Sequence, residues 1–173
     1  MKPSAKFKCK SCGKWHEGVR GWSYPFPMKY FDVPEAERAT RCYLSEDLCV
    51  VDHSHFFVRG CLDIPILDHS ERLVIGAWAE MDEQDFFEYQ DLLDTPRRNT
   101  FGPYNGNLSA AIPTYEHTEG VALLVRVEND GIRPSLVVAK ANHPLAVDQA
   151  SGISVTRLQL FYSYFEPRLG AAG

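Results

Sequence analysis

Two cysteines near the start of the chain, Cys9 and Cys12, have the spacing of a metal-binding pair. Thiolates separated by two residues can bind one ion, because the backbone turn between them aims both sulfurs at one point. Gly13 follows the second cysteine and lets this turn close without a Cβ clash. His16 lies four residues beyond Cys12, so its imidazole can join the two sulfurs on a tetrahedral zinc ion.

A closed structural zinc site needs a fourth ligand, for which the sequence offers several candidates. Cys49 is the favoured one, because it lies in an expected strand, which presents its thiolate from a rigid backbone. Cys42, His53 and Cys61 are weaker alternatives. Four protein ligands leave no open position for a substrate, so the metal would hold the N-terminal residues onto the sheet. Two ordinary thiols, or a redox pair, remain alternative interpretations of the motif.

A second polar group lies in the last third of the chain, where His143 precedes an expected helix and Asp148 and Gln149 follow about one turn later. An imidazole and a carboxylate can act as base and acid when both side chains reach one pocket. Together with Arg59 and Trp78, these residues are the candidate cleft of a small enzyme. Helix capping by His143 is the structural alternative.

Known catalytic motifs give no support to a particular reaction. The sequence contains no nucleophile elbow, Walker loop, dinucleotide-binding fingerprint or paired-histidine zinc motif. The sequence therefore favours a binding protein over an enzyme without excluding the latter.

Lysines and tryptophans crowd the N-terminal segment around the cysteine pair. Basic side chains beside stacking aromatic rings are a common means of binding single-stranded nucleic acid. The whole chain has a net charge of −5, however, and so lacks the electrostatic footprint of a nucleic-acid-binding protein. A solvated charged segment is the simpler interpretation. The residues concerned are Lys2, Lys6, Lys8, Lys10, Lys14, Trp15 and Trp22.

Length and composition predict one domain with a substantial core, because 173 residues with 45% hydrophobic side chains can bury most of their apolar surface. We expect a loop-rich, metal-pinned cap over residues 1–31, a core over 32–165 and a flexible tail over 166–173. No apolar run approaches the ~20 residues of a membrane span, and no secretory signal is visible. With five cysteines, an odd number, the expectation is a cytoplasmic protein with reduced thiols.

Hydrophobic periodicity predicts an α+β fold, with a mainly antiparallel sheet, a few short helices and a zinc-knuckle-like N-terminal cap. Residues 94–118 are rich in turn formers, with Pro96, Gly102, Pro103, Gly106 and Pro113. Strands are expected at 48–51, 56–67, 73–79, 121–127 and 135–139, and helices after Asp82, at 144–151 and at 153–165.

Taken in order along the chain, these motifs resemble the bacterial family of uncharacterised proteins catalogued as domain of unknown function 2199. The resemblance covers about residues 7 to 160 and is carried by the combination of motifs. It runs through Cys9-x-x-Cys12-Gly13-x-x-His16, Ser45-x-Asp47-Leu48-Cys49-Val50-Val51-Asp52, Phe56-Phe57-Val58-Arg59-Gly60, Asp63-Ile64-Pro65-Ile66, Gly76-Ala77-Trp78-Ala79 and His143-Pro144-Leu145-Ala146-Val147-Asp148-Gln149.

The resemblance implies a soluble bacterial single-domain protein with a helix over 153–165, but it implies no reaction. It marks eight positions for testing without giving them roles: Cys9, Cys12, His16, Cys49, Arg59, Trp78, His143 and Asp148.

A zinc-stabilised binding or protein-interaction module, with structural Zn²⁺, is the function that the sequence favours. The partner would be an unidentified protein or small molecule and not a membrane, and the acidic balance of the chain suits a basic partner. The sequence does not define the oligomeric state. A small enzyme with a cleft around His143, Asp148 and Arg59 is the alternative, and nucleic-acid binding through the basic N-terminal segment is a weaker one.

Overall fold

Two long strands form the centre of the fold. A computed structural model of the chain describes residues 2–10, 12–129 and 131–169, with side chains up to residue 165. In it β6 (His55–Pro65) and β7 (Arg72–Met81) pair antiparallel from Phe56 opposite Met81 to Pro65 opposite Arg72. Both strands are rich in β-branched and aromatic residues, which suits a pleated and half-buried surface.

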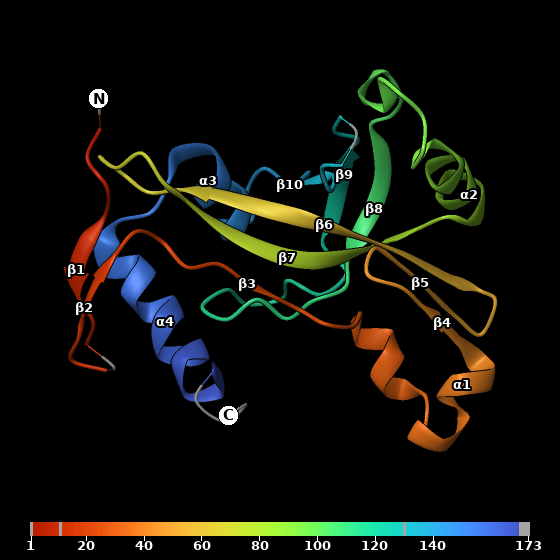
Figure 1. The fold of residues 1–173 in the computed structure, drawn as a ribbon, viewed down its shortest axis with the longest axis horizontal. Coiled ribbons are helices and arrows are strands. Elements are labelled where there is room, and N and C mark those ends of the chain that lie inside the picture. Colours follow the sequence, from red (N-terminus) through yellow and green to blue (C-terminus); the bar gives the residue numbers. More distant parts are fainter. Residues whose placement is uncertain (1, 11, 130, 170–173) are drawn as a thin grey trace.

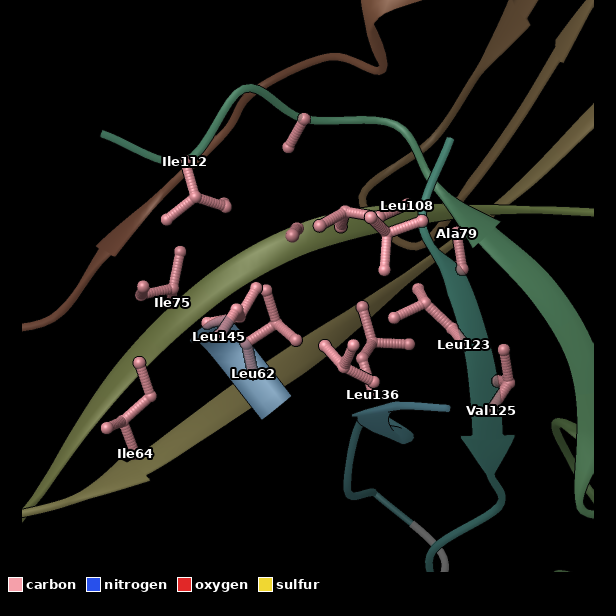
Figure 2. Packing of buried hydrophobic residues seen from close by; sticks show 14 of the residues in the cluster. Leu62, Ile64, Ile75, Ala79, Leu108, Ile112, Leu123, Val125, Leu136 and Leu145 are labelled. Atoms are coloured by element: carbon pink, nitrogen blue, oxygen red, sulfur yellow. The ribbon is translucent and has the colours of Figure 1, made fainter. Parts of the chain in front are cut away.

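The sheet closes into a five-strand barrel. From β7 it continues through β8 (Tyr104–Leu108), β9 (Ala122–Arg126) and β10 (Ser135–Val138), and β10 then pairs with β6. Closure pairs strand edges that would otherwise be exposed. Figure 2 shows how side chains of the barrel strands and of α3 (Pro144–Ser151) meet in the interior. They include Leu62, Ile64, Ile75, Ala79, Leu108, Leu123, Val125, Leu136 and Leu145.

Three short strands extend the sheet beyond the barrel. β5 (Leu48–Val51) pairs with β6, β4 (Cys42–Leu44) pairs with β5, and β3 (Trp22–Ser23) pairs with β7. The β10–β6 and β3–β7 pairings are parallel, whereas the other pairings in this sheet are antiparallel. The fold is thus a mixed, sheet-dominant one with helices packed on it, and its closure into a barrel is a feature that the sequence did not reveal.

Strand β8 lies within residues 94–118, the segment that we described as rich in turn formers and in which we assigned no strand. Its sequence, Tyr-Asn-Gly-Asn-Leu, has little intrinsic strand propensity. Pairing with β7 on one side and β9 on the other holds it in the barrel. The lack of a side chain at Gly106 matters here, because an added Cβ would lie 3.0 Å from the Glu80 carbonyl oxygen and 3.3 Å from Val125. Tertiary pairing therefore overrides local preference in this segment.

The barrel is closed by a short parallel seam between β10 and β6. Ser135 pairs with Cys61, whose backbone N–H donates to the Pro134 carbonyl oxygen at 2.9 Å. An added Cβ at Gly60 would lie 2.6 Å from that oxygen, so glycine permits this close approach. Further along β10, the side-chain amide of Gln149 makes the hydrogen bonds that a neighbouring strand would otherwise make. It accepts from the Val138 N–H and donates to the Leu136 carbonyl oxygen, both at 2.9 Å.

The expected helices are confirmed with their capping residues. Asp82 caps α2 (Glu83–Leu92) by accepting the Asp85 N–H at 2.8 Å. Gly152, with φ of +87°, ends α3 as expected of a glycine beyond a helix C-terminus. Before α4 (Val155–Leu169), the Ser154 hydroxyl accepts from the N–H of Arg157 at 3.2 Å.

Helix α4 continues through residues 166–169, which we expected to begin a flexible tail. Residues 170–173, the rest of that expected tail, lie outside the described part of the chain. None of the helices among the described residues is long and apolar enough to cross a bilayer. Short helical turns complete the fold at Met28–Asp32, Glu35–Glu37, Arg38–Arg41 (α1) and Arg98–Thr100.

The N-terminal residues form a separate two-strand sheet, β1 (Lys6–Lys8) with β2 (Trp15–Glu17). This hairpin lies beside α4 at one end of the molecule, whereas β4 and β5 lie at the other end (Figure 1). The segment expected as a loop-rich cap thus contains a hairpin and also contributes β3 to the main sheet.

The Gln149→Leu substitution tests the seam. It removes both amide hydrogen bonds and leaves the Val138 N–H and the Leu136 carbonyl without their partner, so we expect a loss of about 2 kcal/mol in the free energy of unfolding. Urea denaturation measures this loss. The control is Gln90→Leu on the exposed surface of α2, expected within about 0.5 kcal/mol of wild type. Equal stability of the two variants would contradict a stabilising role for Gln149.

Candidate metal centre

The β1–β2 hairpin brings the sequence motif into a tight loop. Phe7 lies opposite His16 in the ladder, and the Cys9 N–H donates to the Lys14 carbonyl oxygen at 2.8 Å. Inside the loop, the Gly13 N–H donates to the Cys9 carbonyl oxygen at 3.0 Å, and Gly13 has a φ of +70°. Glycine is favoured at this left-handed backbone position, which supports the role assigned to it from the sequence.

Cys9, Cys12 and His16 converge within this loop. Their candidate ligand atoms all lie within 4.8 Å of one another, and Cys12 Sγ is 3.2 Å from His16 Nε2. A tetrahedral zinc ion with bonds of about 2.3 Å to sulfur and about 2.0 Å to nitrogen separates such atoms by about 3.6 Å. The Cys12–His16 contact is close to that value, and the donor set of two thiols and an imidazole suits zinc.

Helix α4 packs against the hairpin. The His16 ring stacks near Phe7 and Tyr162, with ring centroids 5.7 and 5.9 Å apart respectively. The Tyr162 hydroxyl accepts the Arg20 N–H at 2.7 Å, and the Gln159 amide donates to the Lys8 carbonyl oxygen at 3.4 Å. The ligand loop is therefore fixed to the C-terminal helix by rings and hydrogen bonds. Sequence analysis missed Tyr162, because no local pattern links residues 146 positions apart.

The structure does not bring Cys49 to this group, which has three members in the described part of the chain. Cys49 lies in β5, opposite Leu44 and Phe57, and is fully buried beside Trp78. Pairing with both β4 and β6 fixes β5 at the far end of the molecule from the hairpin (Figure 1). The expected four-ligand site that includes Cys49 is therefore corrected to a group of three.

The weaker candidates for the fourth ligand also lie outside this group. Cys42 packs beside the buried cluster around Cys49. His53 lines a hollow of about 300 Å³ next to β4, and Cys61 lies in the barrel seam. A strand holds the thiol of Cys49 in a fixed orientation. The sequence alone does not reveal which part of the molecule that strand lies in.

Arg59 and Trp78, two of the candidate cleft residues, form a contact of their own. Trp78 is fully buried, and its indole N–H donates to the Tyr24 carbonyl oxygen at 2.9 Å. The Arg59 guanidinium lies over the indole, 5.6 Å from the ring centroid, and donates to the Ser23 hydroxyl at 2.7 Å. Burial lowers the pKa of Arg59, and the nearby Arg133 lowers it further. These contacts attach the residues around β3 to the main sheet.

His143 caps α3, so the structural alternative to a catalytic role is the one that the geometry supports. Its Nδ1 accepts the Leu145 N–H at 3.2 Å, while Nε2 lies 3.2 Å from the Glu116 carbonyl oxygen. A carbonyl can only accept, so the proton of a neutral ring belongs on Nε2. Both ring nitrogens therefore have structural partners.

Asp148 is likewise held by its neighbours. Its carboxylate accepts from the Tyr115 hydroxyl at 2.6 Å and lies 3.6 Å from the Arg157 guanidinium. Burial, and the hydrogen bond to Asp148, raise the pKa of Tyr115. Among the described residues, no hydrogen bond or ion pair joins Arg59 to His143 or Asp148. The expected cleft around these three residues therefore stays a prediction.

The geometry defines a class of protein: a mixed β-barrel domain with helices and a three-residue Cys–Cys–His cluster in an N-terminal hairpin. The chain belongs to the family described as uncharacterized proteins conserved in bacteria, domain of unknown function 2199, whose model matches residues 8–153. The match includes the cysteine cluster and the whole barrel, and it confirms the resemblance seen in the sequence. No curated protein and no solved structure matches the chain.

The buried thiol of Cys49 gives the protein a testable pH dependence. Burial raises the pKa of Cys49 from 9.0 to about 12, with a further contribution from Cys42. Between these two values the unfolded chain loses the proton and the folded chain keeps it, so this thiol contributes stability below pH 9 that is lost as the pH rises toward 12. As the pH rises over this range, we expect the free energy of unfolding of wild type to fall relative to that of Cys49→Ala.

Urea denaturation at about pH 7, 9 and 10.5 measures this effect. Tyrosines with raised pKa values titrate in both proteins, so the comparison isolates the thiol. A stability difference that does not change with pH would show that Cys49 ionises at its ordinary pKa.

Proposed function

We propose that this protein is a zinc-stabilised binding module, in which Cys9, Cys12 and His16 hold Zn²⁺. The observation that carries the proposal is the convergence of three suitable ligand atoms within 4.8 Å in one hairpin. Water, or a donor group from a partner, would complete the tetrahedron. Thiolate ligands persist in a reducing compartment, which is consistent with a cytoplasmic location.

The metal would stabilise the hairpin and its attachment to α4. A two-strand hairpin is at best marginally stable by itself, and this one has strands of three residues. Zinc binding contributes directly to the folding free energy of such small elements. Because the His16 ring stacks on Tyr162, an ion on His16 would also restrain the helix beneath it.

Metal content and its loss in a ligand variant test this proposal. We expect one zinc per chain in the purified protein by elemental mass spectrometry, and loss of most of it in Cys12→Ser. Chelation should lower the melting temperature of wild type, because a ligand that binds only the folded state stabilises it. The same treatment should have little effect on Cys12→Ser.

Two cysteine variants serve as controls. Cys61→Ser changes a half-buried thiol in the barrel seam, and Cys49→Ala removes the thiol that the sequence favoured as the fourth ligand. Both should keep stoichiometric zinc. Zinc below a tenth of an equivalent in wild type, or equal zinc in wild type and Cys12→Ser, would overturn the proposal.

The outward face of the hairpin favours single-stranded nucleic acid as a second candidate ligand. Phe7 and His16 face α4, so Lys6, Lys8 and Trp15 lie on the opposite, exposed face, where Trp15 keeps 67% of its surface exposed. An exposed indole beside lysines provides both base stacking and phosphate attraction. Glu17 shares this face, and the net charge of −5 opposes tight binding.

Fluorescence anisotropy with a labelled oligouridylate tests this second candidate. We expect weak binding at about 50 mM salt that falls at about 200 mM, and a loss of about tenfold in Trp15→Ala. Tyr43→Ala, which removes another exposed aromatic ring at the far end of the molecule, is the matched control. Absence of binding at the lower salt concentration would exclude this candidate.

A further inference from the structure

A groove of about 660 Å³ lies beside the barrel seam, between α3 and β10. It is separate from the metal centre, because none of the described residues of the β1–β2 hairpin lines it. Its volume is within the range of small-molecule sites, which are commonly found beside or inside β-barrels. The groove exists because β10 and β6 pair over only a short stretch and α3 packs where they separate.

The walls of the groove are largely apolar. Val137 of β10 faces it from one side, and Ala146, Val147 and Ala150 of α3 face it from the other. Val147 keeps 48% of its surface exposed, which is a large exposed fraction for a valine in a helix. Gln149 already pairs with the β10 backbone at residues 136 and 138. An apolar group can therefore enter without stripping water from those backbone groups.

Charged side chains line the same groove, and all but one have a partner. Asp63 lies 3.6 Å from the Arg72 guanidinium, and the Glu128 carboxylate accepts from the Ser135 hydroxyl at 2.7 Å. Arg126, in β9, has no carboxylate within ion-pair distance among the residues that the structure describes. Arg126 is therefore the cation of the groove that has no carboxylate partner, while the Glu128 carboxylate keeps its negative charge because a hydroxyl donor does not neutralise it.

We propose that this groove binds a small organic anion with an apolar chain. The guanidinium of Arg126 would bind the carboxylate or phosphate group, because its planar donors match such oxygens. The apolar chain would lie between Val137 and the α3 residues Ala146, Val147 and Ala150. The pairing of an unpartnered cation with apolar walls favours this ligand class over neutral or cationic ones.

Titration with octanoate, octyl phosphate and 1-octanol tests the proposal. These probes share one apolar chain and differ in the head group. Methyl NMR signals of Val137 and Val147 report binding in the groove. We expect saturable shifts with at least one of the two anions and binding at least tenfold weaker for 1-octanol. The two anion titrations distinguish carboxylate from phosphate recognition.

Two variants and a control locate the binding. Arg126→Met should weaken binding of the preferred anion by about tenfold, the value of one charge-assisted contact, and leave 1-octanol unchanged. Ala150→Trp should fill the groove and weaken binding of all three probes. Arg20→Met removes an exposed arginine that lines none of the described cavities and should bind like wild type.

The proposal is overturned if neither anion binds, if 1-octanol binds as tightly as the anions, or if folded Arg126→Met and Ala150→Trp both keep wild-type affinity. Circular dichroism establishes that the variants are folded. The Cys12→Ser variant should keep the groove affinity, because its substitution lies in the hairpin. Failure of the groove and failure of the zinc site are therefore separate outcomes.

Discussion

The antiparallel ladder between β6 and β7 is the interaction on which the rest of the structure depends. β7 carries β3 and β8 as further neighbours, and β6 carries β5 and the returning strand β10. Gly60 lets β10 approach β6, and Gln149 pairs with the part of β10 that β6 does not reach. The position of α3, and of the groove beside it, follows from the way this seam is closed.

The metal cluster combines local and distant constraints. The spacing of Cys9, Cys12 and His16 and the turn at Gly13 are local, so they fold the three ligands together within one hairpin. The orientation of the His16 ring depends on Tyr162, which lies on the last helix of the described chain. A site of this kind is recognisable from sequence spacing, while its attachment to the domain depends on packing that spacing does not encode.

Several polar residues that suggested a cleft instead join elements to one another. His143 caps a helix and also contacts Glu116, Asp148 pairs with Tyr115, and Arg59 covers Trp78. Buried polar groups generally need partners, and a compact polar motif in a sequence is often a set of such bonds. The groove beside α3 was missed for the opposite reason: its walls are alanine and valine, which give no chemical signal in a sequence.

By itself, the sequence determined the helices with their caps at Asp82, Ser154 and Gly152, the strands with clear alternation and the metal motif. These features depend on contacts between residues a few positions apart, where side-chain type and spacing suffice. The tertiary structure alone decided the barrel closure, strand β8, the burial of Cys49 far from the hairpin and the partners of Arg59 and His143. Each of these depends on which strands become neighbours, and that choice is made by packing of the whole core.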